Sequence, residues 1–160
     1  MEIEIKESAP FILLSSVLNK PGVGAKVCEA LASHNINIES LITVSVPGKE
    51  RTDILIEVAQ EDLDEANYLL SEVTEEIEAK GLLSPGINVE ELTKLIIKTP
   101  KLAEQPGIGA KVFSIFSKHK INVWALVVTS VGDKSEMKIL VEKQQIQEHP
   151  EVISEIKRTV

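Results

Sequence analysis

Two short glycine pairs are the first candidates for chemistry in this chain. Gly22 and Gly24 lie in the stretch PGVGAKV, and Gly107 and Gly109 lie in PGIGAKV. Glycine lets another molecule approach the backbone, and N–H groups at a helix start favour anions, so each pair could hold a phosphate. The dinucleotide and P-loop patterns require further residues that are missing here, so we expect no nucleotide site. The structural alternative is tight packing of a helix start on a sheet.

The cysteine and the histidines predict no catalytic or metal site. Cys28 occupies the position that Phe113 has in the second stretch, which is typical of buried packing rather than of a nucleophile. His34 and His119 fall at predicted helix ends, where a histidine can interact with the last carbonyls. His149 lies in a polar segment, and no spacing of Cys, His and Asp is typical of a metal site. We therefore expect no enzyme activity, no metal and no cofactor.

The glycine pairs belong to an internal repeat. Residues 21–38 align without gaps with residues 106–123, and nine of the eighteen positions are identical. Repetition at this spacing indicates one supersecondary unit used twice, and two copies are far too few for a solenoid.

In the first copy, the apolar pattern predicts a complete α+β unit. Helical spacing and strict alternation distinguish its helices from its strands, and a Pro-Gly step ends the first strand. Gly81 and Pro85-Gly86 end the second helix. The predicted order, β-α-β-β-α-β, is that of a ferredoxin-like antiparallel sheet with helices on one face. The elements are strand 11–17, helix 23–34, strand 36–46, turn 47–50, strand 52–58, helix 63–77 and strand 87–89.

The second copy repeats this order but lacks its last strand. An open sheet edge leaves backbone groups unpaired. Ile3 and Ile5 alternate with polar residues in MEIEIKE, so we hypothesise that residues 2–6 supply the missing edge strand. The predicted domains are 8–90 and 91–160, with residues 1–7 completing the second sheet. The elements of the second copy are strand 95–97, helix 108–119, strand 121–131, strand 137–141 and a helix that begins near Pro150.

Composition excludes several classes of partner. The net charge of −8 is unfavourable for nucleic acids and anionic membranes, and aromatic residues make up only 3% of the chain, so an RNA-binding sheet is not expected. No apolar run approaches the roughly 20 residues of a membrane span. A single cysteine rules out an internal disulfide, and the acidic, alternating N-terminus is unlike a signal peptide. These features predict a cytoplasmic protein.

The repeated stretch resembles the ACT domain. The motif Pro-Gly-x-x-Ala-Lys-Val is followed by a helix and by Asn-Ile-Asn-Ile, and GVGAKVCEALASHNINIESLITVSV precedes RTDILIEVAQEDLDEA. Two such copies in tandem are similar to the regulatory half of aspartate kinases, without the catalytic domain. The resemblance implies a non-catalytic sensor of a small amino acid, a homodimer, and a biosynthetic enzyme as a possible target.

The resemblance also implies where the ligand would bind, between the loop and helix start of one domain and the second strand of its neighbour. A helix start suits the ligand carboxylate, and Glu39 could hold the ammonium. Asn19 departs from the family's common Asp, and Trp124 stands where the first copy has Glu39, so the first copy is the better candidate. Lysine side chains in these turns are most simply solvated. The candidate residues are Asn19, Lys20, Pro21, Gly22, Val23, Gly24, Ala25, Asn37, Ile38, Glu39, Glu104, Gln105, Gly107, Ile108, Gly109, Asn122 and Val123.

Two alternatives remain open at this point. Asn37 and Asn122 could contact a ligand, but Asn also suits the turn between a helix and a strand. The whole chain could also be a dimerisation or interaction module that clamps a partner enzyme and needs no ligand.

Overall fold

The computed structural model describes residues 1–77, 86–131 and 134–160. The chain divides into two compact units. The first unit is Ala9–Glu90, and the second unit combines Met1–Ser8 with Glu91–Val160. The predicted helix end at Gly81 and Pro85 lies outside the described residues.

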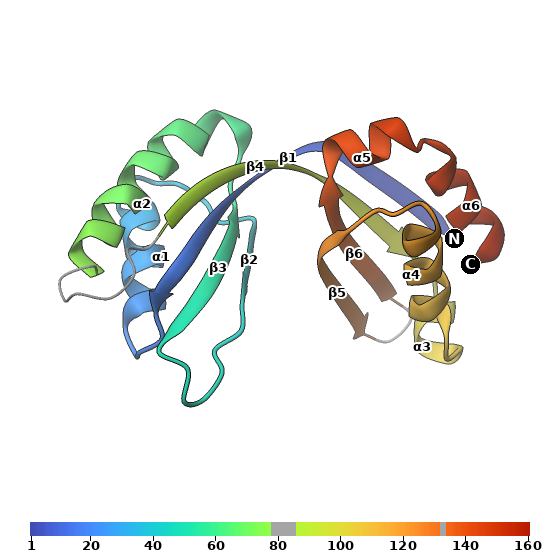
Figure 1. The fold of residues 1–160 in the computed structure, drawn as a ribbon, viewed down its shortest axis with the longest axis horizontal. Helices are drawn as coiled ribbons and strands as arrows, with labels where there is room; N and C mark the ends of the chain where they lie inside the picture. Colours follow the sequence, from blue (N-terminus) through green and yellow to red (C-terminus); the bar gives the residue numbers. More distant parts are fainter. Residues whose placement is uncertain (78–85, 132–133) are drawn as a thin grey trace. The chain divides into compact units, whose positions relative to one another are not determined.

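The first unit is a ferredoxin-like fold, as predicted. Its strands follow the order β2–β3–β1–β4, and β3 pairs antiparallel with both β1 and β2, with Ile56 opposite Ile12 and Leu41. In Figure 1, α1 and α2 lie on one face of these strands. The elements are β1 (Glu2–Leu18), α1 (Val23–Ser33), β2 (Ser40–Thr43), β3 (Arg51–Glu57), the 3₁₀ turn η1 (Gln60–Asp62), α2 (Leu63–Ile77) and β4 (Gly86–Lys98).

The core of the first unit lies between this sheet and the two helices. Alternation along β3 turns Ile54 and Ile56 toward the helices, since successive strand side chains point to opposite faces. Leu31 from α1 and Leu70 from α2 are fully buried against them. The aliphatic core expected from the low aromatic content is therefore present.

The second unit has the same architecture, with the strand order β1–β4–β6–β5. β6 pairs antiparallel with both β4 and β5, and the N-terminal residues of β1 belong to this unit. Phe116, Ile139 and Ile156 are buried in its core. The remaining elements are α3 (Lys101–Glu104), α4 (Ile108–Lys118), β5 (Val123–Val131), β6 (Lys134–Glu142), α5 (Lys143–Glu148) and α6 (Glu151–Thr159). The short helices α3 and α5 were not predicted, because four and six residues are too few to show a helical period.

The predicted strand 36–46 is shortened to β2, Ser40–Thr43. The late start of β2 follows from the way α1 ends, with Asn35 at φ +58° in the left-handed region. The Asn35 and Ile36 N–H groups donate back to the carbonyls of Ala32 and Leu31, which is a Schellman motif. Ile36 is buried although it lies outside a strand. The alternating pattern therefore correctly indicated burial at this position but not strand pairing.

α4 ends in the same way. Lys120 has φ +56°, and the Lys120 and Ile121 N–H groups donate to the carbonyls of Ser117 and Phe116. The expected interaction of His34 and His119 with the last helix carbonyls is therefore wrong. The backbone satisfies those carbonyls, and both imidazole rings instead pair with carboxylates.

Candidate functional site

The two glycine turns have the same local geometry. Gly22 (φ +92°) is the N-cap of α1 and Gly107 (φ +94°) is the N-cap of α4, and neither helix start has a side-chain cap. Each N-cap carbonyl accepts the first helical hydrogen bond at 3.0 Å, from Lys26 and Lys111 respectively. Positive φ explains glycine at 22 and 107, since other residues strain there. The uncapped first turns present backbone N–H groups, as an anion site requires.

Tight helix packing does not explain these glycines. A methyl group added at Gly22, Gly24 or Gly107 would meet no atom of the described residues within 4 Å, and at Gly109 it would meet Met137 only at 3.9 Å, an ordinary contact. Gly24 is exposed and has no positive φ. Neither backbone conformation nor contact within the described part of the chain requires glycine at position 24, although glycine costs about 1 kcal/mol relative to alanine in a helix.

Asn19 anchors the β2–β3 turn. Its Nδ2 donates to the carbonyls of Val46 (3.1 Å) and Lys49 (2.9 Å), and its backbone N–H donates to the carbonyl of Glu50 at 2.8 Å. An aspartate here could not donate either side-chain bond and would face two carbonyl oxygens. This explains the departure from the family's Asp, and it leaves Oδ1 as the side-chain atom that a ligand ammonium could use.

We expect Asn19→Asp to destabilise the first unit by about 1–2 kcal/mol, because two hydrogen bonds are lost and a negative charge faces carbonyl oxygens. Urea unfolding with amide exchange as a unit-specific readout measures the effect. Glu104→Asp is the matched control at the equivalent position, where the side chain is exposed, and should change stability by less than about 0.5 kcal/mol. Equal effects of the two substitutions would contradict the anchoring role.

The remaining candidates of the first copy differ in exposure. Lys20, Pro21, Ala25, Asn37 and Glu39 are exposed. Val23 is buried, and Ile38 is half-buried against the same core. The side chains of these two apolar residues therefore serve packing, and only their backbone groups remain for a ligand. The Glu39 backbone N–H donates to the Glu57 carbonyl at 2.9 Å, which holds the start of β2 on β3 and leaves the Glu39 carboxylate in solvent.

Several polar groups beside the second turn are already engaged within their own unit. The Asn122 N–H donates to Gln145 Oε1 (3.3 Å), and Trp124 Nε1 donates to Glu142 Oε1 (3.4 Å). Gln105, which follows α3, donates its N–H to the Lys101 carbonyl at 2.8 Å. Ile108 is buried in the core and Val123 is half-buried against it. Glu104 and Asn122 have exposed side chains. The two copies therefore share a turn but differ beside it.

Sequence reasoning missed a polar β-bulge that precedes the first glycine turn. The register of β1 against β3 shifts between Leu14 and Val17, and Ser16 has φ +60°. The Ser16 N–H donates to Asp53 Oδ1, and Arg51 Nη1 donates to the Ser16 carbonyl, both at 2.9 Å. Bulges redirect a strand, so this one sets the direction in which the chain enters the turn. The only sequence signal was Ser15-Ser16 within an apolar run.

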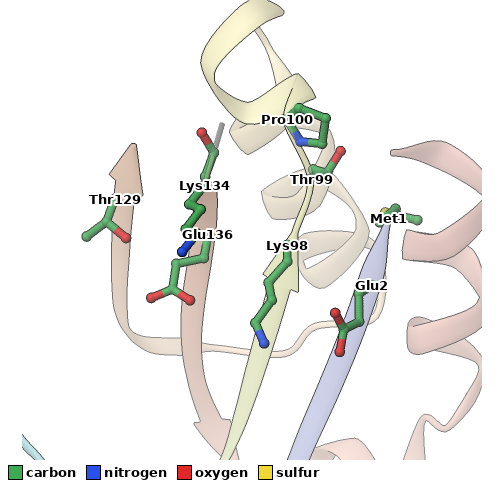
Figure 2. A pocket seen from close by; sticks show the side chains of 9 residues that line it. Met1, Glu2, Lys98, Thr99, Pro100, Thr129, Lys134 and Glu136 are labelled. Atoms are coloured by element: carbon green, nitrogen blue, oxygen red, sulfur yellow. The ribbon is translucent and has the colours of Figure 1, made fainter. Parts of the chain in front are cut away.

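A hollow of about 740 Å³ lies in the second unit, and no residue of the second glycine turn lines it. Figure 2 shows Glu2, Lys98, Lys134 and Glu136 around it. Lys98 Nζ lies 3.5 Å from Glu4 Oε2, and Glu136 Oε1 lies 3.0 Å from Lys138 Nζ. Two charged residues of the lining, Lys98 and Glu136, therefore already form ion pairs within the second unit. The lining is Met1, Glu2, Lys98, Thr99, Pro100, Thr129, Lys134, Ser135 and Glu136.

Known proteins share both the motif and the fold. Residues 13–78 match the profile of the AHAS small subunit-like ACT domain. This match assigns residues 13–78 to an ACT-like domain. The match covers the first glycine turn, its helix and the elements that follow, while the second copy of the turn lies outside it.

The chain also resembles aspartate kinases over a longer stretch. An aspartokinase of Thermus thermophilus is 29% identical over 120 residues, which are 74% of this chain and 28% of that enzyme. The chain therefore spans little more than a quarter of the curated relative it matches.

Solved structures show the tandem fold over the whole chain. The regulatory subunit of aspartate kinase from Thermus thermophilus, in its ligand-free form, superposes with a TM-score of 0.81 at 21% identity, covering 100% of this chain and 98% of that one. Escherichia coli aspartokinase III, solved with lysine and aspartate in its T-state, superposes with a TM-score of 0.61 at 19% identity, covering 98% of this chain and 33% of that one. The described helices are all too short or too polar to cross a membrane.

Proposed function

We propose that this chain is a non-catalytic regulatory module that binds a small amino acid at the first glycine turn. The observation that supports the proposal is that nothing in the described structure requires a glycine at position 24. Gly24 is exposed and lies in the first turn of a helix that has no side-chain cap. Its φ is not positive, and an added methyl group would meet no described atom within 4 Å. The close approach of a ligand to the backbone would account for this glycine. An amino acid suits the site because its carboxylate complements the helix N-terminus.

The ammonium of the same ligand needs an acceptor. The exposed Glu39 carboxylate and the Asn19 Oδ1 are the acceptors that the first copy offers among the predicted residues. We propose that the turn of one domain and the 37–39 segment of a neighbouring domain enclose the ligand together. The neighbour is the first unit of a second copy of the chain. A ligand bound in this way favours one pairing of domains over another, and such coupling is typically about 1–3 kcal/mol.

The proposed target is a biosynthetic enzyme in the cytoplasm. An aspartate kinase catalytic domain is the first choice, because the chain resembles a separate regulatory subunit and full-length aspartokinases. The lysine and aspartate bound by the Escherichia coli relative make these two the first ligands to test.

We expect at least one of the twenty standard amino acids, at millimolar concentration, to raise the melting temperature or change the oligomeric state. A ligand at 100 times its dissociation constant stabilises the bound state by about 2.7 kcal/mol. Differential scanning fluorimetry and light scattering measure both effects. Glu39→Ala should abolish the response while leaving the ligand-free melting curve unchanged, because the side chain is exposed. Glu29→Ala removes another exposed carboxylate, on α1 itself, and should leave the response intact. The absence of any response from the wild-type chain would overturn the proposal.

Exposed apolar residues support a second candidate, a ligand-independent interaction module. Val44 is 73% exposed and Val46 is 47% exposed beside β2, an outermost strand of the first unit. Val127 and Val128 are exposed on β5, an outermost strand of the second unit. Apolar edges of this kind are typical of interfaces. Dimerisation that Val44→Lys abolishes, and that no amino acid alters, would favour this function.

A further inference from the structure

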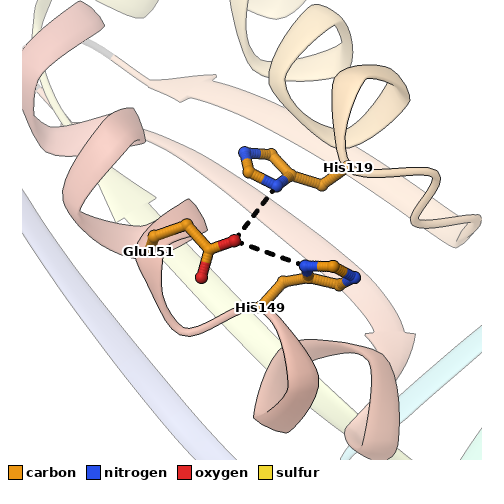
Figure 3. A group of neighbouring side chains, drawn as sticks. All are labelled: His119, His149 and Glu151. Atoms are coloured by element: carbon orange, nitrogen blue, oxygen red, sulfur yellow. Dashed lines mark hydrogen bonds and ion pairs between the residues drawn. The ribbon is translucent and has the colours of Figure 1, made fainter.

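A cluster of two histidines and a glutamate joins the end of α4 to the start of α6 in the second unit. His119 directly follows α4, His149 lies between α5 and α6, and Glu151 is the first residue of α6. Figure 3 shows both imidazole rings turned toward the Glu151 carboxylate. One ligand atom from each side chain lies within 4.8 Å of the other two. His119 lies far from His149 and Glu151 in the sequence, so spacing alone predicted no site.

The distances within the cluster fit a metal ion. His119 Nδ1 and His149 Nδ1 each lie 3.3 Å from the same atom, Glu151 Oε1. Ligands about 2.0–2.1 Å from a tetrahedral Zn²⁺ lie about 3.3–3.4 Å from one another. Both histidine-to-carboxylate distances therefore equal the edge of such a tetrahedron. The ring centroids lie 5.5 Å apart and the ring planes meet at 55°, and both Nδ1 atoms approach the same carboxylate oxygen.

Glu155 places His119 in the tautomer that a metal requires. His119 Nε2 lies 2.9 Å from Glu155 Oε2, and Lys118 Nζ donates to the other oxygen, Oε1, at 2.8 Å. A neutral imidazole carries one N–H, and donating it from Nε2 leaves the Nδ1 lone pair facing Glu151. A carboxylate that accepts the remote N–H of a ligating histidine is the usual second-shell partner in metal sites.

Charge and access also favour a cation. Glu151 and Glu155 bring two negative charges and Lys118 one positive charge, so the neutral-histidine cluster is an anion. The side chains of His119, His149 and Glu151 are 13%, 37% and 52% exposed. An ion can thus enter from solvent, and a water molecule can complete its coordination.

We propose that His119, His149 and Glu151 bind one divalent transition-metal ion, with Glu155 positioning His119. Imidazole with carboxylate ligands suits Zn²⁺ and its neighbours Co²⁺ and Ni²⁺. The bound ion links α4 to α6 and stabilises the second unit. The first copy supplies an internal comparison, because His34 Nδ1 pairs with Glu65 Oε1 at 3.0 Å and belongs to no such cluster among the described residues.

The test uses the full chain without an affinity tag and with Cys28→Ser, so that the thiol cannot bind metal. Co²⁺ titration should give visible ligand-field absorption that saturates at one ion per chain, and Zn²⁺ should displace it and raise the melting temperature. His149→Ala and Glu151→Gln should each weaken Co²⁺ binding at least 100-fold. Glu155→Gln should weaken it about 10–100-fold, as outer-shell partners do.

His34→Ala is the matched control and should leave the Co²⁺ affinity unchanged. The rival explanation is a protonated His119 held between two carboxylates, with no metal. In that case, NMR signals of His119 and His149 would stay unmoved when Zn²⁺ is added, which would overturn the proposal. Binding of Co²⁺ that survives both His149→Ala and Glu151→Gln would overturn it as well.

Discussion

Removal of residues 1–7 is expected to destabilise the second unit by about 3 kcal/mol while leaving the first unit close to its original stability. β1 is the hydrogen-bonded neighbour of β4, and its residues up to Ser8 belong to the second unit, whereas the first unit begins at Ala9. Ile3 packs against the second core, and its partial burial contributes about 1 kcal/mol. Each lost strand hydrogen bond adds about 1 kcal/mol.

Amide exchange, resolved by residue, measures the two units separately. Protection should fall in β4 and β6 and stay high in α1, β3 and α2. Glu4→Gln is the control, since the pair between Glu4 and Lys98 is exposed at 3.5 Å and such pairs contribute little. Unchanged protection in the second unit after the deletion would show that the N-terminal strand is dispensable.

Alanine substitutions at Gly22, Gly24 and Gly107, where an added methyl group meets no described atom, should change the free energy of unfolding in opposite directions. Gly22→Ala and Gly107→Ala each force a side chain to φ above +90°, which costs about 1–2 kcal/mol in the unit concerned. Gly24→Ala should instead stabilise the first unit by up to about 1 kcal/mol, because alanine is the better helix residue and a methyl group there meets no described atom within 4 Å.

Gly24→Ala should weaken ligand binding although it stabilises the fold. If a ligand lies against the backbone at this point, the added methyl group should weaken the amino-acid response at least tenfold. Gly109→Ala, at the equivalent place in the second copy, should leave that response intact. Chemical unfolding gives the stabilities and ligand titration gives the affinities. A Gly24→Ala chain that is stabilised and still responds like the wild type would remove the main support for a ligand at this turn.

The repeat made the architecture readable from the sequence. Apolar residues at helical and alternating spacing placed α1, α2, α4 and β3 correctly, since burial of one face imposes those periods on any sequence that folds this way. The positive φ of Gly22 and Gly107 follows from a Pro-Gly step before a helix. The ACT resemblance rested on these same local features, because a turn is formed by residues adjacent in the chain.

Features that depend on contacts between distant residues were not predictable in the same way. The end of β2 at Thr43 is one such feature. Val44 and Val46 continue the alternation but are exposed. The alternating pattern shows which residues are apolar, but it does not show which residues pair with a neighbouring strand. The role of Asn19 is another, since its partners Val46 and Lys49 reach it only across the sheet. The bulge at Ser16 likewise depends on Asp53 and Arg51 from β3.

The sequence by itself determined the order of helices and strands in the two repeats, the aliphatic core and the two glycine turns, because each is specified by residues close together along the chain. Only the tertiary structure showed that Gly24 is not needed for packing, since that depends on the atoms surrounding an empty position. It also brought His119 to His149 and Glu151, because the packing of α4 on α6 decides which side chains of separate helix ends share one point in space.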